Sequence, residues 1–256
     1  MLLAIDVGNT NVVLGVFEGD DLVADFRLHT DERSTGDELG LLVVGLLRSR
    51  DIAPEQITAV VVSNVVPILG RPIEELSHHY FKLMPMMVGP GIRTGMRILA
   101  EDPRQAGADR IVNSIAAFRR YGGPAVVVDF GTATTFDAIS PSGDYLGGAI
   151  APGIVIGLDA LVSHAAKLTR VELVAPPTVV GRNTTAAMQA GLVYGYVGLV
   201  EGIVGRMKAE LGEGCKVVAT GGLAELIAGQ TSAIDTVDQR LTLDGLRIIH
   251  ELNAPS

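Results

Sequence analysis

The sequence contains one cysteine, Cys215, among 256 residues. A single cysteine excludes an intramolecular disulfide and a multi-cysteine zinc site, and it fits a reducing compartment. Basic residues are also few, since 20 lysines and arginines stand against 29 acidic residues and give a formal net charge of −9. Such a chain, without a run of Lys or Arg, repels nucleic-acid phosphates and anionic lipids. We therefore expect no nucleic-acid partner and no membrane partner.

The amino terminus shows no secretion signal. Residues 1–6 lack a basic segment, and Asp6 places a carboxylate before an apolar segment can form. No stretch is predicted to reach the length that spans a membrane. These features predict a cytoplasmic protein.

Two common nucleotide-binding motifs are missing. The sequence has neither Gly-x-x-x-x-Gly-Lys-Ser/Thr nor a Gly-x-Gly-x-x-Gly that opens a helix. This disfavours a P-loop kinase and a Rossmann dehydrogenase. The 31 glycines instead form short clusters after apolar runs, a pattern typical of backbone that approaches a ligand closely.

What the chain does contain is an internal similarity between residues 2–22 and 125–145. In each segment a β-branched apolar run ends in an aspartate, one apolar residue, a glycine and small polar residues, and Asp6 and Asp129 lie 123 residues apart. The repeat predicts a duplicated α/β architecture, with two similar domains that flank a cleft. The alternative is two unrelated strand-turn-strand units.

The periodicity of each half agrees with this duplication. The first half predicts further helices over 35–50, 67–81 and 109–120, and strands over 57–65 and 84–88. The second half predicts a helix over 183–211, a strand over 216–220 and two more helices that end near residue 252. The breaker cluster at 121–124 predicts a hinge and a boundary between domains 1–121 and 122–256.

The two strand-end segments carry the residues best suited to a phosphate. Gly8 and Gly131 permit tight backbone, and side-chain donors follow each of them. These donors are Asn9, Thr10, Asn11, Thr132 and Thr134. Asp6 and Asp129 end apolar strands, where a carboxylate is costly unless it is paired or near a cation. We interpret the pair as cation-binding; the alternative is that each aspartate caps its own turn.

Five strings in order resemble the type III pantothenate kinase family over essentially the whole chain. They are Asp6-Val7-Gly8-Asn9-Thr10, Gly107-Ala108-Asp109-Arg110, Asp129-Phe130-Gly131-Thr132, Gly147-Gly148-Ala149-Ile150-Ala151-Pro152-Gly153 and Thr220-Gly221-Gly222. The resemblance implies the actin-like fold of the acetate and sugar kinase superfamily. It also implies ATP-dependent phosphorylation of pantothenate, the first step of coenzyme A synthesis.

The resemblance further implies roles for matching residues. Those implied to bind ATP are Asp6, Val7, Gly8, Asn9, Thr10, Asn11, Val12, Val13, Thr132, Gly221 and Gly222. Those implied to bind pantothenate are Gly107, Ala108, Asp109, Arg110 and Thr184. Asp109 matches the catalytic base, Asp129 matches a ligand of a monovalent cation (K⁺ or NH4⁺), and Asp6 lies near the Mg²⁺ that accompanies ATP. Without the family, Asp109 reads as a residue favoured by a helix N-terminus.

The chain departs from the family pattern at one place, and the resemblance also implies an oligomeric partner. Some members place a tyrosine shortly before the Gly-x-Asp-Arg string, whereas residues 98–102 contain none. Glycines at helical spacing between 191 and 205 predict close helix approach, in the core or at a dimer seam. The resemblance favours a homodimer.

Three other readings stay open. The chain could be a kinase of the same superfamily that acts on another metabolite, or a nucleotide-binding regulator of transcription that transfers no phosphate. A chaperone or filament ATPase of the same superfamily is disfavoured, because those chains are longer.

Overall fold

The computed structural model describes residues 1–102 and 105–254, which form two compact units. Unit 1 comprises residues 1–95, 102–116 and 241–256, and unit 2 comprises residues 96–101 and 117–240, within those described limits. The last helix therefore belongs to unit 1, whereas the predicted division placed it in the second domain. The predicted boundary at 121/122 lies just after the point where helix α3 passes from one unit to the other.

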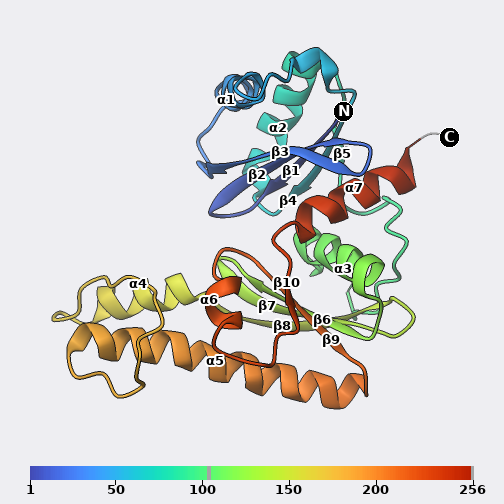
Figure 1. Ribbon diagram of the computed structural model, residues 1–256. Helices are drawn as coiled ribbons and strands as arrows, with labels where there is room; N and C mark the ends of the chain where they lie inside the picture. Colours follow the sequence, from blue (N-terminus) through green and yellow to red (C-terminus); the bar gives the residue numbers. More distant parts are fainter. Residues whose placement is uncertain (103–104, 255–256) are drawn as a thin grey trace. The chain divides into compact units, whose positions relative to one another are not determined.

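Unit 1 is built on a five-stranded sheet of order β3-β2-β1-β4-β5. Its strands are β1 (Leu2–Val7), β2 (Asn11–Glu18), β3 (Asp21–His29), β4 (Ala59–Asn64) and β5 (Met86–Met87). β1 pairs antiparallel with β2 and parallel with β4. Figure 1 shows this sheet with its helices.

The helices of unit 1 cover both faces of this sheet. They are α1 (Gly36–Arg48), α2 (Gly70–Leu76) with a π-helical extension over Ser77–Phe81, the 108–116 part of α3 (Ala108–Tyr121), and α7 (Leu241–Asn253). Short 3-10 turns lie at Pro54–Gln56 and Pro67–Leu69. α1 starts where Thr35 and Glu38 form a reciprocal capping box, and it buries Leu39, Val43 and Leu47 at four-residue spacing.

Unit 2 repeats the same sheet with the order β8-β7-β6-β9-β10. Its strands are β6 (Ala125–Phe130), β7 (Ala133–Ile139), β8 (Tyr145–Pro152), β9 (Lys216–Thr220) and β10 (Thr236–Val237). β6 pairs antiparallel with β7 and parallel with β9, as β1 does with β2 and β4. This equivalence confirms the predicted duplication and the actin-like α/β fold.

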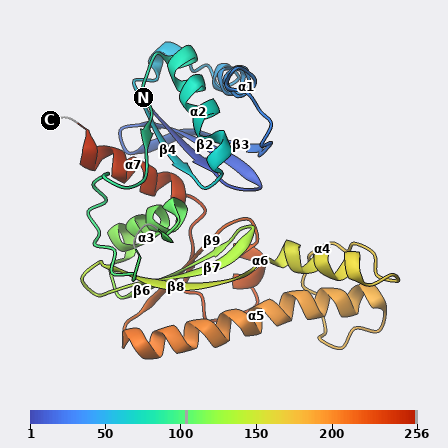
Figure 2. The same ribbon diagram turned by 180° about the vertical axis from the view of Figure 1, so that it is seen from behind.

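The helices of unit 2 are α4 (Ile154–His164), α5 (Thr184–Leu211) and α6 (Ala224–Ala228), with the end of α3. Figures 1 and 2 agree that α4 and the start of α5 lie side by side beyond the edge of the sheet. The rest of α5 runs along the sheet, where Val193, Val200 and Val204 join the buried core.

α5 corrects one expectation from the sequence. Its 28 residues are long and apolar enough, by length and composition, to cross a membrane, although no stretch was predicted to reach that length. The same properties mark the central helix of a folded domain, and α5 packs in that way against strands β6 and β7. The sequence predicted the helix over 183–211 but not its apolar character, because its charged residues gather in its C-terminal part, between Glu201 and Glu210.

Candidate functional site

The predicted site residues are divided between the two units. Residues 6–13 and 107–110 belong to unit 1, and Asp129, Thr132, Thr184, Gly221 and Gly222 belong to unit 2. Each group is therefore described within its own unit.

In unit 1, the turn between β1 and β2 is fixed by three hydrogen bonds. The Gly8 N–H donates to the Asn11 carbonyl at 3.0 Å, and the Thr30 N–H donates to the Thr10 carbonyl at 3.0 Å. The Thr30 hydroxyl donates to the Gly8 carbonyl at 2.6 Å. Asn9 and Thr10 remain exposed. The turn thus presents polar groups from a rigid backbone, and Thr30 contributes to it from 22 residues away without a signal in the sequence.

Side chains along β1 and β2 alternate between the two faces of the sheet, so some residues of this segment point into the core and others do not. Val7 and Val12 are buried in the core with 0% and 2% exposure, so only their backbone can reach a ligand. Asp6 leaves the sheet on the opposite face, and its Oδ1 is buried. Asp6 is the one carboxylate of this loop, and its burial calls for a compensating cation or hydrogen bonds.

Asp109 is the second residue of α3, and its side chain is partly buried. Burial raises the pKa of Asp109 above its ordinary value, and the Arg110 N–H, which donates to Oδ1 at 2.8 Å, lowers it in part. A carboxylate with a raised pKa is a stronger proton acceptor while it remains ionised near neutral pH. The start of α3 thus presents a carboxylate that can accept a proton.

Gly107 makes room for this carboxylate. A Cβ at residue 107 would stand 2.4 Å from Oδ1 of Asp109, closer than a real contact allows. Ala108 begins the helix, and the Arg110 carbonyl accepts a hydrogen bond from the Ser114 hydroxyl at 2.8 Å. Four of the five residues predicted to bind pantothenate therefore form one helix start, arranged around Asp109.

In unit 2, the β6–β7 turn resembles the first one. The Gly131 N–H donates to the Ala133 carbonyl at 3.1 Å, and the Gly153 N–H donates to the Thr132 carbonyl at 3.1 Å. Gly131 and Thr132 are exposed. Gly153 lies in the fourth string of the family resemblance, and its N–H fixes the position of the Thr132 backbone through this hydrogen bond.

The structure brings Asp129 and Gly221 together. Gly221 follows β9 with φ of +92°, and a Cβ at that position would stand 2.6 Å from Oδ1 of Asp129. Gly222, the next residue, has open space where a Cβ would be. The Gly221 carbonyl accepts a hydrogen bond from the Gln239 amide at 3.2 Å. The second loop and the predicted adenosine stretch are thus adjacent.

Thr184 occupies a different part of unit 2. It is the exposed first residue of α5, after Asn183, whose side chain caps the helix by accepting from the Ala186 N–H at 2.8 Å. The start of α5 lies with α4 beyond the edge of the sheet (Figure 2). Thr184 therefore belongs to a helix start and not to the strand-end group around Asp129.

Residues 96–101, which contain most of the stretch without a tyrosine (98–102), are attached to the start of β8. The Tyr145 N–H donates to the Arg97 carbonyl, and the Leu99 N–H donates to the Tyr145 carbonyl, both at 2.8 Å. The Arg97 guanidinium forms two hydrogen bonds with the Asp144 carboxylate, at 2.6 and 2.7 Å. This contact is the main reason that the pKa of Asp144 falls to about 2. Backbone hydrogen bonds to Tyr145 and the ion pair between Arg97 and Asp144 thus fix this stretch to the start of β8.

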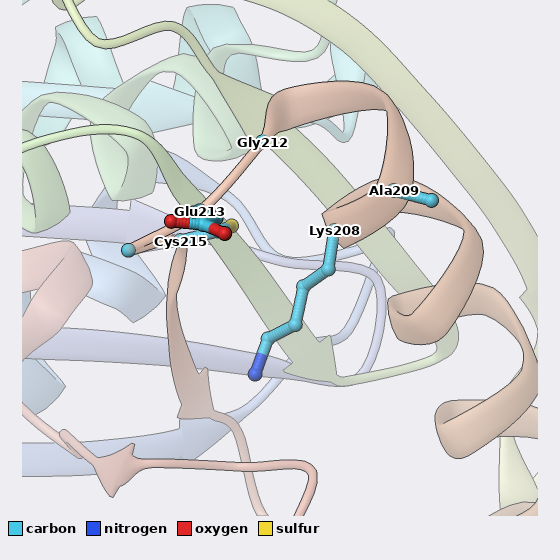
Figure 3. Close-up of a pocket in the computed structure, with 6 residues that line it drawn as sticks. Lys208, Ala209, Gly212, Glu213 and Cys215 are labelled. Atoms are coloured by element: carbon cyan, nitrogen blue, oxygen red, sulfur yellow. The ribbon is translucent and has the colours of Figure 1, made fainter.

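A separate pocket lies where α5 ends and β9 begins (Figure 3). It measures about 520 Å³ and is lined by Lys208, Gly212, Glu213 and Cys215, among others. Cys215 is buried, and burial raises the pKa of its thiol. None of the lining residues belongs to the predicted site.

The part of the chain that the structure describes contains no group of three His, Cys, Asp or Glu residues able to hold a metal ion. Magnesium commonly binds through one or two carboxylates, water and substrate phosphates. The single carboxylate of Asp6 beside the polar turn at Asn9 and Thr10 fits an ion of that kind.

Comparison with known proteins identifies a family for the chain. The profile of the family described as type III pantothenate kinase matches residues 2–206. A type III pantothenate kinase of Myxococcus xanthus (strain DK1622) is 59% identical over 256 residues, which is 100% of both chains. One from Moorella thermoacetica (strain ATCC 39073 / JCM 9320) is 55% identical over 99% of this chain and 100% of its own.

Solved structures with low identity show the same fold. A Baf family transcriptional activator homologue from Campylobacter jejuni aligns with a TM-score of 0.63 and 21% identity over 98% of each chain. The inorganic polyphosphate/ATP-glucomannokinase of Arthrobacter sp. strain KM aligns with a TM-score of 0.51 and 15% identity, over 98% of this chain and 97% of its own. At these identities the likeness concerns the fold alone.

Proposed function

This chain belongs to the type III pantothenate kinase family, and from that premise we propose that it transfers the γ-phosphate of ATP to pantothenate and so begins coenzyme A synthesis. Full-length identity of 59% to a relative named for this activity carries the proposal. The partly buried Asp109 at the start of α3 supports it, because an actin-like binder without transfer activity has no need of a base.

In the proposed reaction Asp109 acts on the attacking hydroxyl. Asp109 accepts the hydroxyl proton, the hydroxyl oxygen bonds to the γ-phosphorus, and the bond from that phosphorus to the bridging oxygen of ADP breaks. Arg110, next to the base, offers a cation to the pantothenate carboxylate. Gly107 and Ala108 supply backbone at the same helix start.

The two strand-end loops bind ATP in this proposal. Residues 6–13 of unit 1 and Thr132, Gly221 and Gly222 of unit 2 contact the nucleotide through exposed polar groups and close backbone. Asp6 would hold the Mg²⁺ that offsets phosphate charge. Asp129 would bind a monovalent cation, K⁺ or NH4⁺, with oxygen ligands of the kind that such ions prefer.

The proposal also includes a homodimer in the cytoplasm. Glycines 191, 195, 198 and 205 of α5 have open space where a Cβ would be, so this side of the helix can be approached closely. A second copy is the partner that the family resemblance favours for this surface, and Thr184 at the start of the same helix would serve a pantothenate pocket near it.

The first test is ATP consumption by the purified protein with and without pantothenate, in potassium and in sodium buffer. We expect turnover that requires pantothenate and is several-fold faster in potassium. A panel of other hydroxylated metabolites serves as the control. ATP binding without pantothenate-dependent turnover would favour a regulator or another substrate.

Replacing Asp129 with Ala should weaken the dependence on potassium. The carboxylate near Gly221 is the proposed ligand of the cation, and its loss removes the charge that attracts that ion. The measurement is initial rate against potassium concentration at saturating ATP and pantothenate. A variant with the wild-type potassium midpoint would contradict the assignment.

A further inference from the structure

Each sheet pairs its strand-end aspartate with a hydroxyl residue on the neighbouring parallel strand. In unit 1, Asp6 of β1 is the register partner of Ser63 in β4. In unit 2, Asp129 of β6 is the register partner of Thr220 in β9. Register partners on adjacent strands project from the same face of a sheet, about 4.7–4.9 Å apart. The same carboxylate–hydroxyl juxtaposition thus occurs in both copies of the duplicated fold.

The side chains of Asp6 and Ser63 lie on the face that carries α7. Ala4, two residues before Asp6, shares its face and pairs with Gly15. A Cβ on Gly15 would stand 2.9 Å from Cδ1 of Leu243 in α7. The opposite face holds Ile5 and the large core of the unit. Ser63 is therefore enclosed between the sheet and its helical cover.

The hydroxyl of Ser63 is unusual because it is fully buried and yet forms no hydrogen bond within the described residues. Ser63 is 0% exposed, and its Oγ has no hydrogen-bond partner within residues 1–102 and 105–254. Ser77 is equally buried, yet its hydroxyl donates to the Leu83 carbonyl at 2.9 Å. An unsatisfied buried hydroxyl is unfavourable, and alanine would fill this place without that penalty. Retaining a serine here calls for a role in another state of the protein.

We propose that Ser63 is a positioning residue of the magnesium–nucleotide site: its hydroxyl donates a hydrogen bond to the Asp6 carboxylate and orients it toward the Mg²⁺ of bound ATP. The inference rests on the proposed function, because it takes Asp6 as the residue that receives the ion. The two residues are register partners on adjacent strands, so the proposed contact requires a change of side-chain conformation and no change of strand register. Thr220 stands in the same relation to Asp129.

The test is the magnesium dependence of ATP binding in a Ser63→Ala variant. Calorimetric titration of ATP at a series of magnesium concentrations gives the magnesium midpoint without any phosphate transfer. A hydrogen bond to a charged group is worth enough to raise that midpoint by about tenfold when it is lost. Ser63→Thr keeps the hydroxyl, as Thr220 does in the other sheet, and should stay within about twofold of wild type.

Thermal unfolding of the ligand-free variants separates this role from packing. Ser63→Ala should unfold at the wild-type temperature or above it, because the lost hydroxyl has no partner there. Ser77→Ala is the matched control: it should unfold at a lower temperature and keep the wild-type magnesium midpoint. An unchanged midpoint in Ser63→Ala, or a raised midpoint that Ser63→Thr shares, would overturn the proposal.

The magnesium midpoint and the unfolding temperature do not depend on which molecule accepts the phosphate. If wild type binds ATP with magnesium but does not phosphorylate pantothenate, the proposed function fails while the role of Ser63 is still measured. Wild-type ATP binding that ignores magnesium would overturn the role of Ser63 whatever the acceptor is.

Discussion

Replacing Asp109 with Asn is expected to lower kcat by about 10²–10⁴-fold, the usual contribution of a general base. This corresponds to about 3–5 kcal/mol of barrier. Asparagine keeps the size of the side chain and can keep the contact to the Arg110 N–H at 2.8 Å, but it cannot accept the substrate proton. ATP affinity should change little, because the base contacts the acceptor hydroxyl. Steady-state kinetics and calorimetry measure the two quantities.

Asp37→Asn is the matched control. Asp37 is also the second residue of a helix, α1, where the positive end of the helix dipole stabilises its carboxylate. If Asp109 served only its helix, both variants would lose a few tenths of a kcal/mol of stability and neither would lose turnover. A parallel loss of ATP binding in Asp109→Asn would argue against its role as base.

Replacing Gly221 with Ala is expected to lower the unfolding temperature by about 2–8 °C and to weaken ATP binding. The left-handed backbone at φ +92° costs an L-residue about 1–2 kcal/mol, and the added Cβ would press against Asp129 Oδ1 at 2.6 Å and Phe130 backbone at 2.7 Å. Each kcal/mol corresponds to about 2–4 °C in a chain of this size. Scanning calorimetry of the ligand-free protein measures the effect.

Gly222→Ala provides the comparison one residue away. Gly222 has open space at the Cβ position and no positive φ, so its alanine variant should unfold within about 1 °C of wild type, as expected for a surface change. Equal unfolding temperatures for the two variants would show that the close approach of Gly221 to Asp129 is not a constraint on the fold.

The sequence predicted the repeating core of the fold well, and the structure shows why. The similar segments 2–22 and 125–145 begin three-strand meanders that run over 2–29 and 125–152, because their apolar alternation, aspartate ending and glycine turns are local signals. The helices predicted over 35–50, 109–120 and 183–211 appear as α1, α3 and α5 with shifts at their ends. The two-residue strand β10 was not predicted, because two residues carry no periodicity.

The site was predictable only where its residues are consecutive. The helix start at Gly107 to Arg110 and the two turns are short strings, so one sequence suffices to find them. Thr30, which donates to the Gly8 carbonyl, and Ser63, which pairs in register with Asp6, lie 22 and 57 residues from their partners. No local pattern marks either residue, since each is brought near its partner by the arrangement of strands that are distant in the sequence.

The sequence by itself determined the duplication, the family and the candidate residues, because these depend on strings and periods that a chain carries locally. Tertiary structure alone decided that the last helix, 241–253, packs with the first unit, since pairing across long separations follows from which apolar faces remain to be covered. It also decided that Gly221 abuts Asp129 and that the Ser63 hydroxyl is buried beside Asp6. Those contacts join strands distant in the chain, and the parallel register of the sheets brings them together.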